Sequence, residues 1–220
     1  MEKFAGDVKV DNSWVIRLEN RIVQKTIRFV PRWLETYHLT MMTIVWSLGV
    51  IFFGFLAVSD IRWLWTSSLM IFLQYVTDLY DGKVGKHRKT GLIKWGYYMD
   101  HFLDFVFLSC IFAGYYFFLP AEASIYLFGL MAVCAGFMVN SFLSFAATNK
   151  FKIEFLSMGP TQARFGMIAA NTLFIFAGVE APAKFIPIAF FISVAVLAIV
   201  VFSTQKEIWA LDMEEKERRL

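Results

Sequence analysis

Stretches of about 20 residues without a charged side chain recur along this chain, and they restrict its fold more than any other feature. The first runs from about Thr40 to Ser59 and ends just before Asp60. A run of this kind has the length that an α-helix needs to cross a bilayer, roughly 20 residues. The composition agrees, because 58% of the residues are hydrophobic, against about 45–50% in a typical soluble domain. The chain is therefore expected to be a membrane protein.

The runs predict an all-α integral membrane protein with six transmembrane helices, preceded by an N-terminal amphipathic interfacial helix. The predicted spans are about 40–59, 63 into the DLYDG stretch, 92–119, 124–148, 163–179 and 185–204. The expected organisation is a cytoplasmic N-terminal segment (1–38), a six-helix transmembrane domain (39–204) and a cytoplasmic tail (205–220).

The interfacial helix is predicted from a basic periodic segment before the first span. Its cations recur every three or four residues and so share one helical face; they are Arg17, Arg21, Lys25, Arg28 and Arg32. The apolar residues on the other side are Val15, Leu18, Ile22, Phe29 and Trp33. A basic amphipathic helix with aromatic residues is typical of one that lies in a membrane interface. The alternative is a solvated helix packed on a soluble domain, but no such domain is evident.

Lysine and arginine also predict the orientation. They gather in the N-terminal segment, in the loop between the second and third spans, and in the loop before the fifth span. The connections on the opposite side contain only Arg62 and Lys184. Cytoplasmic loops are enriched in these residues. Both termini and the second loop are therefore expected in the cytoplasm.

Four aspartates, Asp78, Asp81, Asp100 and Asp104, lie in DLYDGKVGKHRKTGLIKWGYYMDHFLD, residues 78–104. Spacings of three and four place each pair on one face of its helix, and a short loop lets the two pairs face each other. No basic residue inside the spans is expected to neutralise them. Hard divalent cations would do so, and oxygen ligands suit Mg²⁺, Mn²⁺ or Ca²⁺. Two such ions in a carboxylate cluster are typical of phosphate chemistry.

The residues between the aspartate pairs agree with that interpretation. Gly82, Gly85 and Gly96 leave room for a ligand to approach the helix backbone. Positive charge stands where an anionic group would arrive, on Lys83, Lys86, Arg88, Lys89 and Lys94.

The order of these residues, D-x2-D-G-x2-G-K-x9-G-x3-D-x3-D, resembles the motif of the CDP-alcohol phosphotransferase (CDP-alcohol phosphatidyltransferase) family, D-x2-D-G-x2-A-R-x8–12-G-x3-D-x3-D. The four aspartates, Gly82 and Gly96 match. Gly85 stands where alanine is usual and Lys86 where arginine is usual. Lysine keeps the charge but cannot form a bidentate fork on phosphate.

The resemblance implies a metal-dependent transferase of phospholipid biosynthesis. A CDP-linked donor gives its substituted phosphate to an alcohol acceptor, and CMP leaves. By the same resemblance Asp78, Asp81 and Asp100 bind two divalent cations, Mg²⁺ or Mn²⁺. Asp104 takes the proton of the attacking hydroxyl and also joins the metal ligands. Gly82, Gly85, Lys86 and Gly96 contact the donor's nucleotide and phosphates. Membrane lipid and a second copy of the chain are the further partners that the family suggests, and no nucleic acid is expected.

Four further residues are candidates for substrate contact, each with a structural alternative. Thr40 and Thr161 are either helix caps or substrate contacts. Arg164 is placed to face the same cavity and to help select the donor or acceptor. His101 forms an Asp-His pair like that of choline and ethanolamine phosphotransferases, although it lies off the aspartate face and packing is the alternative.

The substrates stay open at this point. The donor is either a soluble CDP-alcohol with diacylglycerol as acceptor, or CDP-diacylglycerol with a polar alcohol as acceptor. The Asp-His pair favours the first and a basic residue such as Arg164 or Lys152 the second. A small ion-coupled transporter also uses intramembrane carboxylates, but all four aspartates lie near one membrane face. An inactive relative is the remaining alternative, against which the retention of all four aspartates argues.

Overall fold

The computed structural model describes residues 14–90, 92–148 and 160–219, and helices are the only regular secondary structure within them. Residues 1–13 of the predicted N-terminal segment lie outside the described residues, and so does the basic loop 149–159. The elements are α1 (Trp14–Thr26), η1 (Ile27–Phe29), α2 (Thr36–Leu56), η2 (Ile61–Trp63), α3 (Leu64–Arg88), α4 (Ile93–Phe118), α5 (Ala121–Thr148), α6 (Pro160–Ala177), α7 (Glu180–Ala183) and α8 (Ile186–Arg218).

Four helical segments of the described chain are long and apolar enough to cross a membrane: α2, α4, α5 and Glu180–Arg218, which joins α7 and α8. This confirms the all-α prediction and is consistent with an integral membrane protein. The other two predicted spans correspond to α3 and α6, which carry charged residues of the aspartate region. The count of six spans therefore stays a prediction.

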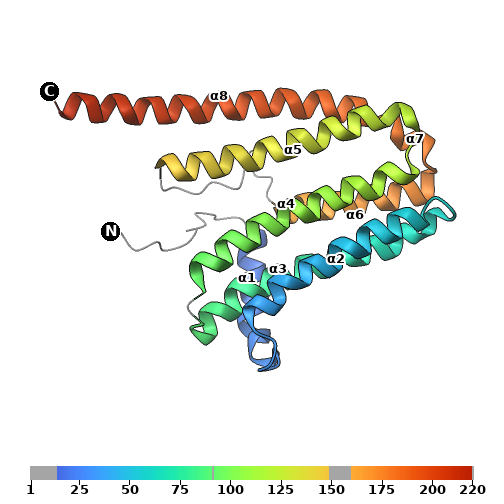
Figure 1. Cartoon of the computed structure of the whole chain (residues 1–220), viewed down its shortest axis with the longest axis horizontal. Coiled ribbons are helices and arrows are strands. Elements are labelled where there is room, and N and C mark those ends of the chain that lie inside the picture. The colour runs from blue at the N-terminus through green and yellow to red at the C-terminus, as the bar shows by residue number, and fades with distance from the viewer. Residues whose placement is uncertain (1–13, 91, 149–159, 220) are drawn as a thin grey trace.

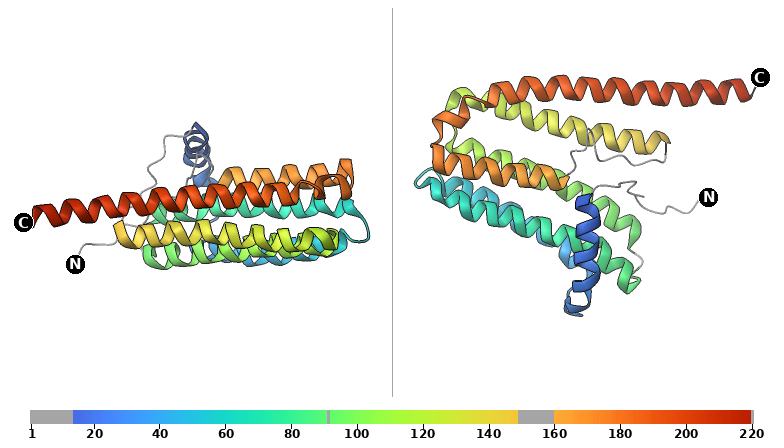
Figure 2. Two further views of the ribbon diagram at one scale, coloured as in Figure 1. Left: turned by 90° about the horizontal axis from the view of Figure 1, so that it is seen from above. Right: turned by 180° about the vertical axis from the view of Figure 1, so that it is seen from behind.

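The long helices form two groups that lie side by side (Figures 1 and 2). Helices α2, α3, α4 and α6 make one bundle, and α5 pairs with α8 beside it. The backbones of α2 and α4 touch, because a Cβ atom added to Gly54 would lie 2.6 Å from the Gly114 Cα atom. Small residues permit such close approach between membrane helices, and this contact fixes α4 directly against α2.

Helix α6 is fastened to the bundle by a polar residue in an apolar setting. Asn171 is fully buried, and its Oδ1 atom accepts a hydrogen bond of 2.8 Å from the Tyr115 hydroxyl of α4. Its Nδ2 atom donates to the Ser68 hydroxyl of α3 at 2.9 Å. A buried amide needs such partners. Their positions on α3 and α4 fix how α6 packs.

Helix α1 lies across the direction of the bundle, against α3 (Figure 2). It buries Glu19 and Val23, whereas Leu18 and Ile22 are about half exposed. These two residues of the apolar face predicted to meet lipid are thus only partly covered by protein. That agrees with the predicted interfacial position, which stays a prediction.

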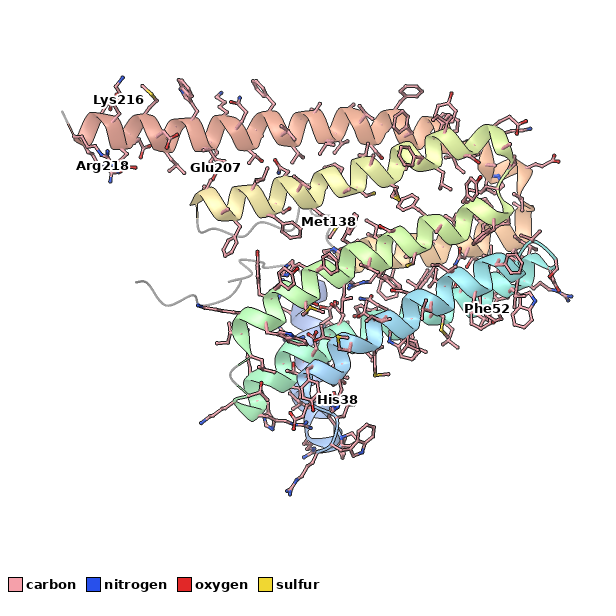
Figure 3. The ribbon with its side chains drawn as sticks, viewed as in Figure 1. His38, Phe52, Met138, Glu207, Lys216 and Arg218 are labelled. Carbon is pink, nitrogen blue, oxygen red and sulfur yellow. The ribbon has the colours of Figure 1, made fainter. Side chains whose placement is uncertain are left out.

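Helix α8 projects beyond α5 at the end of the molecule where α1 and the α3–α4 connection also lie (Figure 1). Figure 3 shows Lys216 and Arg218 on the projecting part. The helix has 33 residues, which corresponds to about 50 Å at 1.5 Å per residue. The predicted span ending near Thr204 and the charged tail are therefore one continuous helix.

Candidate active site

Three of the four aspartates converge between α3 and α4. Asp78, Asp100 and Asp104 each offer a carboxylate oxygen, and these oxygens all lie within 4.8 Å of one another. We call these residues the aspartate trio. Asp100 and Asp104 share a face of α4 because they are four residues apart, and that face meets Asp78 of α3. Carboxylates this close repel one another unless a cation lies among them.

Asp81 belongs to the same region, but its side chain is buried and held by α2. Its Oδ2 atom accepts a hydrogen bond of 2.9 Å from the Thr40 hydroxyl, and its Oδ1 atom accepts one from the Gly82 amide. The Thr36 hydroxyl donates to its backbone carbonyl. Thr40, predicted as a cap or a substrate contact, therefore contacts an aspartate that was predicted to bind metal.

The expectation that no basic residue neutralises the aspartates is wrong. Arg164 of α6 is buried, and one guanidinium nitrogen, Nη1, lies 2.8 Å from Asp78 Oδ2 while the other, Nη2, lies 2.9 Å from Asp104 Oδ1. It thus bridges α3 and α4 from a third helix. Arginine suits such a site because its planar group donates several hydrogen bonds in fixed directions. Sequence reasoning placed Arg164 in the cavity but missed its partners.

Gln74 is a site residue that the sequence analysis missed. It is fully buried one turn before Asp78, and its Nε2 atom donates to Asp104 Oδ1 at 3.2 Å. Its Oε1 atom has no hydrogen-bond partner among the described residues. The four-residue spacing from Asp78 was the signal that could have revealed it. Gln74 thus contacts Asp104, and an amide oxygen without a partner is a kind of ligand that hard divalent cations accept.

The glycines predicted to admit the nucleotide differ in their surroundings. A Cβ atom added to Gly82 or Gly96 would meet nothing within 4 Å, so both leave open space. At Gly85 it would lie 3.2 Å from the Thr36 hydroxyl oxygen, so α2 leaves less space here. Lys86 is exposed.

Arg88, which the sequence placed among the cations awaiting an anion, is occupied elsewhere. Its guanidinium donates to the carbonyl oxygens of Val30, Pro31 and Leu34, the last at 2.7 Å. It also lies 3.6 Å from the Glu35 carboxylate. Arg88 therefore braces the connection between η1 and α2.

His101 lies beside the trio but is engaged by its own helix. Its Nδ1 atom donates to the Tyr97 carbonyl at 2.6 Å, and its ring centroid lies 4.4 Å from that of Tyr97 and 5.6 Å from that of Phe142. These contacts favour the packing alternative. Nδ1 is also 4.0 Å from Asp100.

Thr161 at the start of α6 contacts α1. Its hydroxyl donates to Glu19 Oε1 at 3.3 Å, and the Tyr75 hydroxyl of α3 donates to the same oxygen at 2.9 Å. Thr161 is three residues before Arg164 and Tyr75 is three before Asp78. Glu19 thus joins α1, α3 and α6 next to the trio. As an acid on a basic helix it was visible in the sequence, but its partners were not.

A family model described as CDP-alcohol phosphatidyltransferase matches residues 36–210. The chain belongs to the CDP-alcohol phosphatidyltransferase family. The match begins at the first residue of α2 and includes the trio, Asp81 and Arg164. No curated protein and no solved structure matches the chain.

Helix α1 lies outside the family match, yet it contacts the site through Glu19. We expect Glu19→Ala to lower the free energy of unfolding by about 1–3 kcal/mol, because it leaves two hydroxyls without their acceptor. Glu19→Gln keeps an acceptor oxygen and is expected to retain most of the stability. Thermal unfolding in detergent measures both. An equal loss of stability in Glu19→Ala and Glu19→Gln would show that the charge of Glu19, rather than its acceptor oxygen, stabilises the protein.

Thr40 is expected to support metal binding through Asp81. Thr40→Val removes the hydroxyl at nearly constant volume, and loss of such an outer hydrogen bond typically costs about 10–100-fold in metal affinity. The measurement is the Mn²⁺ concentration that gives half of the metal-induced rise in melting temperature. Thr43→Val, also buried on α2, is the matched control and should leave that concentration unchanged. An equal effect of both variants would contradict the assigned role.

Proposed function

We propose that the aspartate region is the active site of a metal-dependent transferase, which moves a substituted phosphate from a CDP-linked donor to an alcohol and releases CMP. The convergence of three carboxylate oxygens within 4.8 Å carries this proposal. It occurs in the residues that match the family motif, inside a chain matched by the family model over residues 36–210.

Asp78, Asp81 and Asp100 are the proposed ligands of two divalent cations, Mg²⁺ or Mn²⁺, with Asp104 beside them. The set contains only oxygen atoms, which suits these ions. When bound there, the cations would neutralise the donor's pyrophosphate and make its phosphorus more electrophilic.

The chain's own residues bind the donor and move the proton. Gly82 and Gly96 leave space against which the nucleotide can pack, and Lys86 contributes charge to its phosphates. Asp104 accepts the proton of the attacking hydroxyl as general base. The oxygen of the acceptor hydroxyl forms a bond to the phosphorus distal to cytidine. The bond between this phosphorus and the bridging oxygen of the pyrophosphate breaks, and the bridging oxygen leaves as part of CMP.

The membrane arrangement belongs to the proposal as well. We assign six spans, counting α3 and α6, with α1 in the interface and both termini and the site on the cytoplasmic side. The support is the distribution of Lys and Arg. Residues 39–204 are the proposed catalytic domain, between the N-terminal segment 1–38 and the tail 205–220. A homodimer is the assembly that the family suggests.

Two pairings of substrates are proposed, and different residues favour each. A soluble donor such as CDP-choline with diacylglycerol is suggested by the Asp100–His101 pair, although His101 is engaged with Tyr97. CDP-diacylglycerol with a polar alcohol is suggested by a cation beside the site, and Arg164 is buried among the carboxylates.

The deciding experiment measures CMP release by purified protein in nanodiscs. Each donor, CDP-diacylglycerol or CDP-choline and CDP-ethanolamine, is crossed with a panel of alcohols and diacylglycerol, with Mg²⁺, Mn²⁺ or EDTA. Metal-dependent CMP from one pairing would establish the reaction and the donor together. CMP release that is unaffected by EDTA would contradict the metal dependence, and no release from any pairing would contradict the activity on these substrates.

A further inference from the structure

Arg164 contacts two of the three carboxylates that lie close enough together to hold a metal ion. Its two terminal nitrogens lie 2.8 Å from Asp78 Oδ2 and 2.9 Å from Asp104 Oδ1. Resting on the proposed function, we propose that Arg164 is an internal counter-cation, which bridges the trio when divalent ions are absent and gives up these contacts when they bind.

The first argument is competition for the same acceptors. Asp104 Oδ1 already accepts from both Arg164 Nη2 and Gln74 Nε2. A carboxylate oxygen has about two lone-pair sites. A metal ion approaching this oxygen therefore has to replace one of the two donors. Arg164 carries the positive charge that the ion replaces, so it is the donor that moves.

The second argument is electrostatic. Three carboxylates within 4.8 Å would be costly without a cation among them, and the side chain of Arg164 is only 8% exposed at that position. A buried ion pair that loses one partner is strongly destabilised. The same arginine beside two bound divalent cations would instead be a like charge and is expected to turn away.

The third argument is that the helix need not move for the side chain to do so. Asn171, two turns after Arg164, fastens α6 to Tyr115 and Ser68. At the other side, Thr161 is joined to Glu19. Arginine has a long side chain with several rotatable bonds, so the guanidinium can leave the trio while both anchors hold.

The test compares melting temperatures of Arg164→Gln, Arg164→Lys and the unchanged protein, each with EDTA and with saturating Mn²⁺. If Arg164 gives up its contacts to the metal ions, the melting temperature of Arg164→Gln should be lower than that of the unchanged protein with EDTA. With Mn²⁺ the two melting temperatures should be equal. Such an exchange also predicts that the apparent dissociation constant for Mn²⁺ falls roughly tenfold or more, as expected when a competing state holds nine molecules in ten. Arg62→Gln at the opposite end of the bundle is the control and should change neither quantity.

Arg164→Lys separates exchange from simple charge. It keeps the positive charge but cannot bridge two carboxylates with a planar fork. Exchange predicts a dissociation constant between those of Arg164→Gln and the unchanged protein, whereas a general charge effect predicts no change from the unchanged protein. If Arg164→Gln does not fold without metal, Arg164→Lys decides alone.

The failure of this inference differs from the failure of the proposed function. If Arg164→Gln lowers the melting temperature equally with EDTA and with Mn²⁺, Arg164 is a permanent structural bridge. That result would overturn the inference that Arg164 gives up its contacts to the metal ions. Absence of any Mn²⁺-induced stabilisation in the unchanged protein, together with CMP release that ignores EDTA, would overturn the metal site itself.

Discussion

Replacement of Asp104 by asparagine is expected to lower the rate of CMP release by about 10²–10⁴-fold, the range associated with loss of a general base. The amide cannot take the proton of the attacking hydroxyl. It retains an oxygen that can accept from Gln74 and Arg164, which contact Asp104 Oδ1 in the structure. The fold should therefore survive, and turnover is what should be lost.

The measurement is the single-turnover rate of CMP formation with saturating donor and Mg²⁺. Metal-induced stabilisation by Mn²⁺ should remain detectable in Asp104→Asn. Asp60→Asn, in the connection between α2 and α3 at the far end of the bundle, is a matched loss of one carboxylate and should leave the rate unchanged. Full activity of Asp104→Asn would contradict its role as the base.

Asp78→Asn is expected to weaken metal binding, which precedes proton transfer, because it removes a metal ligand. Even a lost outer hydrogen bond costs about 10–100-fold in metal affinity, so a lost ligand should raise the dissociation constant for Mn²⁺ by at least about 100-fold. CMP release at low metal should fall accordingly. High metal concentrations should restore part of it, unlike in Asp104→Asn.

Titration of activity and of melting temperature with Mn²⁺ distinguishes the two aspartates. Asp212→Asn, which lies on the exposed part of α8, is the control for the loss of one negative charge. An unchanged midpoint of the Mn²⁺ titration in Asp78→Asn would remove this residue from the metal ligands. An equal shift of the Mn²⁺ midpoint in Asp78→Asn and in Asp212→Asn would indicate a general charge effect.

The aspartate trio was accessible from the sequence because helical periodicity decides which residues share a face. Asp100 and Asp104 are four residues apart, and a short connection brings the chain back toward α3, so helical spacing sufficed to predict that they meet Asp78. The four apolar helices were visible for a similar reason, since length and hydropathy suffice to predict them. The motif also indicated the family, which the match over residues 36–210 shows.

The partners of the trio could not be obtained in this way. Arg164 is 60 residues beyond Asp104, and its contact depends on how α6 packs, which is set by Asn171 and its partners on two other helices. Glu19 presents the same difficulty, because nothing local pairs it with Tyr75 and Thr161. Gly85 was predicted to admit a ligand, and nothing in the sequence indicated that Thr36 of α2 would lie so close to it. Pairing between distant helices is a property of the whole packing arrangement.

The continuous α8 has a practical consequence for handling the protein. About 30 Å of its length of about 50 Å is needed to cross the hydrocarbon layer, so roughly 20 Å remain as a stiff, charged rod. A fluorescent protein or affinity tag fused at this end would be carried away from the lipid headgroups by the rod. Protein tagged at this end is therefore expected to keep its activity.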